Sequence, residues 1–281
     1  MNYRHAFHAG NFADVHKHMV LIALLERLTR KPKPLFFLDS HAGRGRYDLQ
    51  SGDAQRGNEA QTGIDRLRTC VPVNTDVARY LRLAGLTVGE APAVTASYPG
   101  SPLLALAALR EVDRVVLVEQ QTEEARVLRN ETRHRRNVSV VCGDGYAALP
   151  TWLPPKENRG LVLIDPPYES ANEFETLARA LDTALGRWPN GVYAAWYPLK
   201  SSREAARFLA TLQQSGIRRI LSLELSVRPA DSPLGLNGSG LIIINPPWQL
   251  DLEMRAALDE LHAALAQEGA PKAKVHWLVG E

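Results

Sequence analysis

Short apolar runs recur along the chain, separated by longer stretches of mixed polarity. We interpret seven of these runs as strands, at 35–39, 114–119, 138–142, 161–165, 191–197, 218–227 and 240–245. Helical or loop-like stretches separate the first four, which favours parallel pairing through right-handed crossovers. The pattern therefore predicts an α/β fold with a seven-stranded, mostly parallel sheet.

The interval between the first two strands is unusually long. It carries helical stretches at 54–69 and 75–84, scattered glycine and proline, and no strand periodicity. Without residues 46–98, Glu119 would follow Asp39 by 27 positions, near the spacing of about 20 typical of a ribose-binding acid. We interpret these residues as an inserted helical subdomain, which is either a platform for substrate or an elaboration without substrate contact. The predicted segments are 1–45, 46–98 and 99–281.

Composition limits the class of protein without identifying its substrate. Hydrophobic residues make up 45% of the 281 positions, but no apolar run is long enough to cross a membrane and the first residues lack the apolar core of a signal peptide. Two cysteines, Cys70 and Cys142, form no disulfide or zinc pattern, so we expect the reducing cytoplasm. We also expect a monomer. A net charge of +2 permits a nucleic-acid substrate but does not require one.

The most informative motif is Asp165-Pro166-Pro167-Tyr168, which directly follows the apolar run 161–164. Proline has a fixed φ and no N–H, so this turn cannot continue the sheet. A carboxylate, a main-chain carbonyl and an aromatic ring placed together suit a planar heterocycle with an exocyclic amine. The alternative is a proline turn that only ends a core strand.

A second copy of the pattern, Asn245-Pro246-Pro247-Trp248, follows the apolar run 241–244. Ligands of open α/β sheets bind outside the carboxyl ends of the strands, near the point where strand order reverses. Asp165 ends the fourth predicted strand, close to that point, whereas Asn245 ends the seventh. We interpret the second copy as structural, or at most as a wall of the base pocket.

Acidic residues at strand ends and a glycine turn predict a cofactor site. Asp39 precedes Gly43-Arg44-Gly45, where glycine lets the backbone approach a ligand closely. Glu119 ends the second strand, and Asp144-Gly145 follow the third. Each feature alone is also typical of an ordinary turn, so the prediction depends on their order along the chain.

Ser101 is predicted to cap a helix that starts at Pro102. The free N–H groups of that helix start would suit a cofactor carboxylate, although plain capping is compatible with the same sequence. His41, in the glycine turn, either contacts the cofactor or is a satisfied loop residue. The histidines near the N-terminus lack a cysteine partner, and we expect no metal site.

A basic run follows Glu119 on or just after a predicted helix. It is either a solvated face or a set of phosphate contacts that position RNA without recognising sequence. Its members are Arg126, Arg129, Arg133, Arg135 and Arg136.

The turn at Asp165 resembles that of the amino-methyltransferases, which transfer a methyl group from S-adenosylmethionine to N6 of adenine or N4 of cytosine. Longer motifs, at 3–11, 17–18, 38–47, 98–102 and 164–168, resemble the RlmJ family of bacterial methyltransferases, and the resemblance spans essentially the whole chain. It implies a Rossmann-like class I S-adenosylmethionine-dependent methyltransferase fold and methylation of N6 of one adenine in 23S ribosomal RNA, without a metal.

The resemblance also implies roles for individual residues. Asp165 would be catalytic, with the Pro166 carbonyl as a second acceptor and Tyr168 stacking on the base. Tyr3 and His5, in the N-terminal tail, would close over the cofactor when substrate binds. The implied cofactor contacts are Lys17, His18, His41, Ser101, Glu119, Asp144, Gly145 and Asp165, and Lys17 also belongs to the implied catalytic set.

Three alternatives stay open. The chain could be a DNA adenine-N6 methyltransferase, a non-catalytic RNA-binding assembly factor with the same fold, or a protein methyltransferase that acts on glutamine. The acid at Asp165 favours the adenine amine over the glutamine amide, for which the similar turn carries asparagine. Because flipping a base out of a duplex costs a few kcal/mol, we expect a target in accessible RNA, either free or incompletely assembled.

Overall fold

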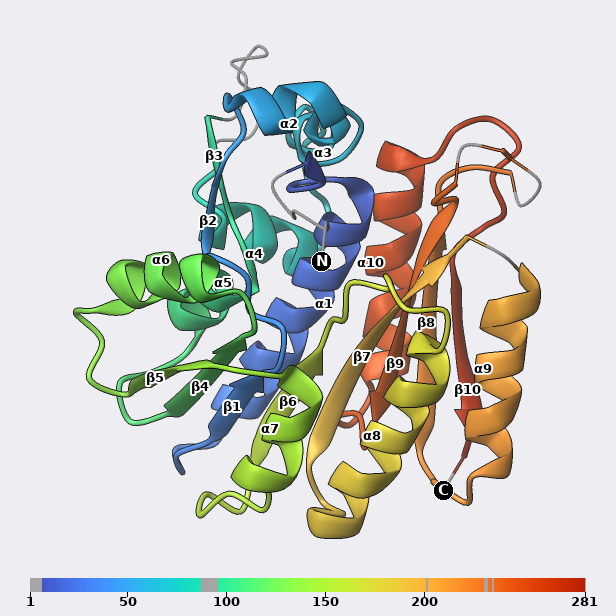
Figure 1. Ribbon diagram of the computed structural model, residues 1–281. Helices are drawn as coiled ribbons and strands as arrows, with labels where there is room; N and C mark the ends of the chain where they lie inside the picture. The colour runs from blue at the N-terminus through green and yellow to red at the C-terminus, as the bar shows by residue number, and fades with distance from the viewer. Residues whose placement is uncertain (1–6, 87–95, 201, 230–231, 234, 281) are drawn as a thin grey trace.

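The computed structural model describes residues 7–86, 96–200, 202–229, 232–233 and 235–280. Within these ranges the main sheet consists of β1 (Phe36–Asp39), β4 (Arg114–Glu119), β5 (Val138–Cys142), β6 (Gly160–Ile164), β7 (Val192–Leu199), β8 (Ile220–Ser226), β9 (Gly238–Ile244) and β10 (Lys274–Val279). The strands lie in the order β10-β8-β9-β7-β6-β1-β4-β5 (Figure 1). The predicted α/β class and mostly parallel sheet are confirmed.

Strand directions bring most carboxyl ends to one edge of the sheet. β5, β4, β1, β6 and β7 pair in parallel, whereas β9 is antiparallel to both of its neighbours, β7 and β8. Because β7 and β8 both oppose β9, they run in the same direction as each other. The ends of β1, β4, β6, β7 and β8 therefore meet at the same edge, where ligands of such sheets bind.

The predicted number of strands is wrong by one, because β10 is an eighth member of the main sheet among the described residues. It pairs antiparallel with β8 at the sheet edge and is only partly buried. The sequence of this edge strand mixes polar and apolar residues, so it contains no long apolar run.

Helices cover both faces of the sheet (Figure 1). Those outside the insertion are α1 (Phe12–Thr29), α5 (Ser101–Ala108), α6 (Thr122–Thr132), α7 (Gly145–Trp152), α8 (Glu173–Arg187), α9 (Ser202–Gln214) and α10 (Leu250–Leu265). Side chains of α1, α5 and α10 pack in one hydrophobic core, and those of α7, α8 and α9 pack in the other.

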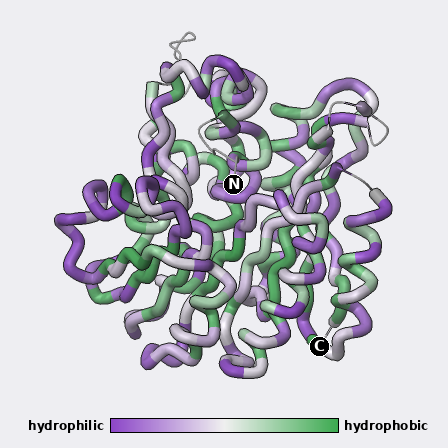
Figure 2. Tube along the Cα trace, viewed as in Figure 1, coloured by the Kyte–Doolittle hydropathy of each residue, from purple (hydrophilic) through white to green (hydrophobic). Residues whose placement is uncertain are grey.

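The central strands are buried on both faces, which explains their continuous apolar sequence. Phe37 and Leu163 belong to the core under α1, whereas their neighbours Leu38 and Ile164 belong to the opposite core. Hydrophobic positions accordingly gather along the central strands, and hydrophilic positions gather on the outer helices (Figure 2). In the described part of the chain, no helix has the length and hydrophobicity needed to cross a membrane.

Helix α1 is buried on nearly all sides between the sheet, α5 and α10. It begins after Asn11, whose side chain accepts a hydrogen bond from Asp14 N at 2.9 Å. Burial forces the polar residues of α1 to find partners. His16 Nδ1 lies 3.0 Å from Ser239 Oγ, and His18 Nδ1 lies 2.7 Å from the Tyr98 hydroxyl.

The insertion is helical in its interior but begins and ends with short strands that the sequence did not predict. β2 (Arg46–Asp48) and β3 (Ser97–Pro99) pair antiparallel and close its base. They are only three residues each, too short to show periodicity. The helical elements between them are α2 (Gly52–Gly57), a 3₁₀ helix (Glu59–Thr62), α3 (Ile64–Arg68) and α4 (Thr75–Leu83).

Candidate active site

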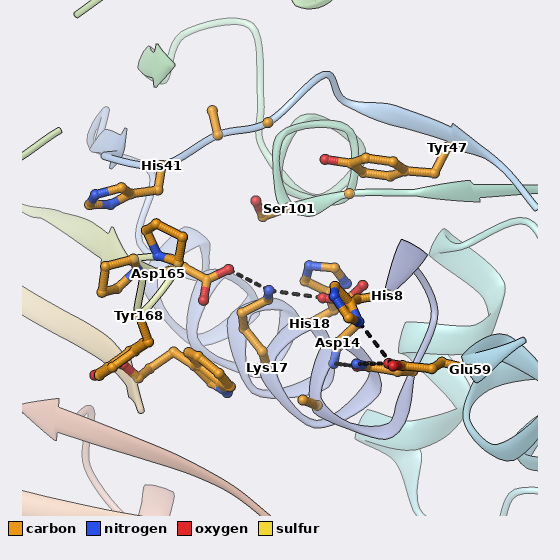
Figure 3. A pocket seen from close by; sticks show the side chains of 18 of the residues that line it. His8, Asp14, Lys17, His18, His41, Tyr47, Glu59, Ser101, Asp165 and Tyr168 are labelled. Carbon is orange, nitrogen blue, oxygen red and sulfur yellow. Dashed lines mark hydrogen bonds and ion pairs between the residues drawn. The ribbon is translucent and has the colours of Figure 1, made fainter. Parts of the chain in front are cut away.

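A cavity of about 880 Å³ opens at the carboxyl edge of the sheet. Segments far apart in the sequence line it together: the start of α1, the glycine turn after β1, the start of α5, the insertion, and the turn after β6 (Figure 3). The cavity therefore joins the predicted cofactor side to the predicted catalytic turn. This is the arrangement that a group transfer between two bound molecules requires.

The turn after β6 presents Asp165 to this cavity, and Pro166, Pro167 and Tyr168 line it as well. Tyr168 adopts a left-handed backbone, with φ at +51°, which is strained for a residue with a bulky side chain. Its hydroxyl donates a hydrogen bond to the Trp196 carbonyl oxygen at 2.9 Å, and its ring lies edge-on to the Trp196 ring, with centroids 5.5 Å apart. The structure thus holds the strained turn in place through Tyr168.

Lys17 lies between two carboxylates, those of Asp14 and Asp165 (Figure 3). Its Nζ atom is 2.9 Å from Asp14 Oδ1 and donates a second bond to Asp165 Oδ2. Burial by itself would lower the pKa of Lys17, but the charges of both aspartates outweigh it and raise the pKa well above its usual value. Lys17 is therefore an ammonium ion, and the three groups carry a net charge of −1.

Asp14 was not predicted as a site residue. It is also the acceptor for Gly10 N at 3.0 Å, so it connects Lys17 to the segment that precedes α1. The spacing of Asp14 and Lys17 by three helical positions could have indicated the pair. The ion pair between Lys17 and Asp165 could not have been predicted from helical spacing, because the two residues are 148 positions apart in the sequence.

The glycine turn adopts conformations that only glycine accommodates easily. Gly43 and Gly45 have φ values of +64° and +88°, and a Cβ atom on Gly43 would lie 2.2 Å from the Tyr47 hydroxyl. Glu119 closes the turn by accepting hydrogen bonds from Gly43 N at 2.8 Å and Gln121 N at 2.7 Å. Burial nonetheless raises the pKa of Glu119.

Ser101 does not cap its helix as the sequence predicts. The N-cap is Gly100, Ser101 is the first residue of α5, and the Ser101 Oγ donates to Asp39 Oδ2 at 2.6 Å. Because Ser101 lies one residue inside the helix and not at the N-cap position, its hydroxyl serves as a donor to the buried Asp39 carboxyl group. Burial raises the pKa of Asp39 to about 7, and the nearby charge of Asp165 adds to the rise, whereas the Ser101 bond opposes it.

Comparison with known proteins identifies the family. A model of the family described as "Ribosomal RNA large subunit methyltransferase D, RlmJ" matches residues 32–279. The chain belongs to the RlmJ family. It is 40% identical to Ribosomal RNA large subunit methyltransferase J of Haemophilus influenzae and 38% identical to the protein of the same name from Escherichia coli, in each case over the full length of both chains.

A solved structure agrees with this assignment. A crystal structure of a Legionella pneumophila protein superposes with a TM-score of 0.86 at 33% sequence identity, covering 96% of this chain and 98% of that chain. The Rossmann-like methyltransferase fold expected from the resemblance is therefore confirmed, and the chain is a member of an rRNA methyltransferase family throughout its length.

Of the other residues that the RlmJ resemblance implies as cofactor contacts, three line the cavity and Asp144 does not. His18, His41 and Gly145 line the cavity, and burial lowers the pKa of His41 to about 4, so its ring is neutral. Asp144 does not line it. Its side chain instead caps α7 by accepting from Ala147 N at 2.8 Å.

The remaining sequence-predicted features of this RlmJ-family protein lie either outside the described residues or away from the cavity. Tyr3 and His5 lie outside the described residues. Asn245 lies at the opposite edge of the sheet, because Ile244 pairs with the beginnings of β7 and β8, and its side chain bonds the carbonyls of Pro189 and Gly191. The structural interpretation of the second proline motif is confirmed, and its use as a pocket wall is wrong.

The basic run lies on α6 and directly after it, and none of its five arginines lines the cavity. In the part of the chain that the structure describes, no group of three or more histidine, cysteine, aspartate or glutamate residues could hold a metal ion. Trp196 and Glu59 also line the cavity, although neither was among the predicted site residues. Glu59 accepts from Asn11 Nδ2 at 2.8 Å and lies 2.9 Å from His8 Nδ1, which attaches the insertion to the segment before α1.

Proposed function

We propose that this protein transfers a methyl group from S-adenosylmethionine to the exocyclic N6 of an adenine in 23S ribosomal RNA. The observation that carries the proposal is the single cavity shared by the Asp165 turn and the glycine turn closed by Glu119. The names of the relatives, which are ribosomal RNA large subunit methyltransferases, support a large-subunit rRNA substrate.

The residues on the glycine-turn side fit the cofactor. Glu119 is a nearly buried carboxylate at a strand end, where it could accept ribose hydroxyls, and the glycine turn allows a ligand to approach the backbone. Lys17, His18, His41, Ser101 and Gly145 would complete the set, since all of them line the same cavity. When bound, S-adenosylmethionine supplies an electrophilic methyl group on a positively charged sulfur.

The residues on the other side would position the amine. An adenine amine is a weak nucleophile because its lone pair is delocalised into the ring. Hydrogen bonds from its two N–H groups to the Asp165 carboxylate and the Pro166 carbonyl would favour a pyramidal nitrogen with an available lone pair. Lys17 would hold one oxygen of Asp165, so that the other faces the base in a fixed orientation.

Electrostatics supports the same roles. The amine nitrogen becomes positive as it gains the methyl group, and preorganised negative groups stabilise such a charge most in a buried site. Asp14, Lys17 and Asp165 together carry one net negative charge at this place. Lys17 thus orients Asp165 without cancelling the negative field that the reaction requires.

The test is the transfer of labelled methyl groups to three substrates: protein-free 23S rRNA, assembled large subunits, and DNA. We expect label on the protein-free rRNA, where the base is accessible, and much less on the other two. Label on DNA alone would reject the RNA substrate. Absence of label on every substrate, with cofactor binding intact, would favour the non-catalytic assembly factor.

The residue roles are tested by two matched substitutions. Asp165→Ala should abolish transfer while keeping cofactor affinity within about tenfold, or roughly 1.4 kcal/mol. Asn245→Ala is the control, because it changes the corresponding position of the second proline motif at the opposite sheet edge. Activity retained by Asp165→Ala, or lost equally by Asn245→Ala, would contradict the assignment.

A further inference from the structure

Within the described part of the chain, two of the positively charged side chains in the cavity wall have no carboxylate partner. The lysines and arginines that line the cavity are Lys17, Arg44, Lys200 and Arg228. Lys17 is paired with Asp14 and Asp165, and Arg44 donates to Glu124 through Nε and Nη2, at 2.8 and 2.9 Å. Among the described residues, no carboxylate lies within ion-pair distance of Lys200 or Arg228, so their charges are available to a ligand.

One residue fixes the relative position of these two cations. Asn237 N donates to the Leu199 carbonyl at 3.0 Å, directly before Lys200, and the Asn237 carbonyl accepts from Arg228 N at 3.1 Å. Leu199 and Ser226 both pair with Gly238 at the start of β9. Neighbouring strands lie about 4.8 Å apart, so the two chain segments are separated by roughly 10 Å, a span that two long side chains can cover.

The guanidinium group of Arg228 has unused hydrogen-bonding capacity. Its Nη1 donates to the Leu236 carbonyl at 2.8 Å, while its Nε is buried with no partner among the described residues. A buried donor without an acceptor is costly. The planar fork of arginine matches the oxygens of a phosphate group, which would satisfy such a donor.

The opposite wall of the cavity is lined by acidic residues that already have basic partners: Glu124 pairs with Arg44, Glu123 with Arg126, Glu59 with His8 and Asp53 with Arg56. The insertion contributes Asp53 and Glu59 to the lining, and the start of α6 contributes Glu123 and Glu124. Among the described residues, a phosphate group would find no unpaired cation on that wall and would be attracted to the wall that contains Lys200 and Arg228.

We propose that Lys200 and Arg228 bind the phosphate groups next to the target adenosine. The RNA backbone then crosses the cavity along the ends of β7 and β8, and the flipped base reaches down to Asp165. This inference rests on the proposed function, since it assigns part of the substrate of that same site. It assigns the binding of the RNA strand to residues at the ends of β7 and β8 and not to the insertion.

The test is the salt dependence of methyl transfer to protein-free 23S rRNA by Lys200→Ala, Arg228→Gln and the double variant. Each lost phosphate contact should lower the slope of log(kcat/KM) against log[salt] by about 0.7. The advantage of the unmodified protein over each single variant should then shrink about fivefold between 0.1 M and 1 M salt. We expect the loss in KM, with kcat unchanged at saturating RNA, because neither side chain contacts the amine.

Lys156→Ala is the matched control, because Lys156 is an exposed lysine just before β6, at the far edge of the sheet. A KM and a salt slope equal to those of this control would overturn the inference while leaving the proposed function intact. A loss confined to kcat would overturn it as well. If Arg228→Gln unfolds, Lys200→Ala decides alone. If the unmodified protein methylates no RNA, the proposed function fails and the inference fails with it.

Discussion

Lys17 provides the sharpest test of how this site is built. Its side chain is 6% exposed, and those of Asp14 and Asp165 are 3% and 16% exposed. Lys17→Met keeps much of the volume and removes the charge. Two carboxylates would then remain close together without the cation that separates them.

The expected cost follows from this burial. Removing one member of a buried ion pair costs about 3–5 kcal/mol, because the remaining charge is desolvated and unpaired. For a chain of this size each kcal/mol lowers Tm by roughly 2–4 °C, so Lys17→Met should lower Tm on the order of 10 °C. Asp165→Asn should cost far less, since Lys17 keeps Asp14 as a partner.

Thermal unfolding followed by circular dichroism measures these differences. The raised pKa of Lys17 means that its contribution is fully present below the unfolded-state pKa of about 10.4 and is lost only as pH rises through the higher folded value. The difference in Tm between Lys17→Met and the unmodified protein should therefore be the same at pH 7 and pH 9. Adding Asp14→Asn should restore part of the lost stability, because it removes one uncompensated carboxylate.

Two outcomes would refute this reasoning. If Lys17→Met melts within about 2 °C of the unmodified protein, the buried ion pairs do not hold the site together. If the effects of Lys17→Met and Asp14→Asn simply add, the two residues do not interact. Lys156→Met serves as the control, and as an exposed substitution it should change stability by no more than about 0.5 kcal/mol.

Three further predictions concern the cofactor side and the insertion. Asp39 has its folded pKa raised to about 7, so the folded protein binds more protons than the unfolded chain and stability falls as pH rises from about 4 to 7. Between pH 5 and pH 8 the unmodified protein should lose more Tm than Asp39→Asn, and equal losses would contradict the raised pKa. Glu119→Gln should weaken cofactor binding about tenfold, or roughly 1.4 kcal/mol, because the glutamine amide has one acceptor oxygen in place of two. Calorimetry measures this affinity, and an unchanged value would remove Glu119 from the cofactor site. Gly63→Ala should destabilise the protein by about 1–3 kcal/mol, because its Cβ would lie 2.2 Å from the Gly10 carbonyl oxygen. Gly52→Ala is the control and should not destabilise it, because a Cβ there would have no atom within 4 Å. Similar Tm values for the two variants would show that the insertion tolerates displacement.

The elements that sequence predicted well are those dominated by local pattern. The strands at the sheet centre are continuous apolar runs, because both of their faces are buried. The α4 helix, predicted at 75–84, lies at Thr75–Leu83. Edge strand β10 and the short strands β2 and β3 were missed, since partial burial and a length of three residues leave little signal.

The errors in the site have a different cause. Ser101 has the local sequence of a helix cap, but a buried acid 62 residues earlier takes its hydroxyl. Asp144 follows a strand as a cofactor acid would, yet its carboxylate caps the next helix. In both cases several acceptors and donors compete for one side chain, and only the folded arrangement determines which of them is within reach.

Sequence alone determined the class of fold and the chemistry of the central turn, because hydrophobic periodicity and the geometry of proline act over a few residues. The order of the strands along the sequence already favoured Asp165 over Asn245, and the structure gives the reason: Asp165 follows a parallel strand and Asn245 an antiparallel one. Only the tertiary structure decided that Lys17 holds Asp165 and that, within the described part of the chain, Lys200 and Arg228 have no carboxylate partner. A charged group interacts most strongly with the groups that lie close to it in space, and a local sequence pattern does not specify which distant residues those are.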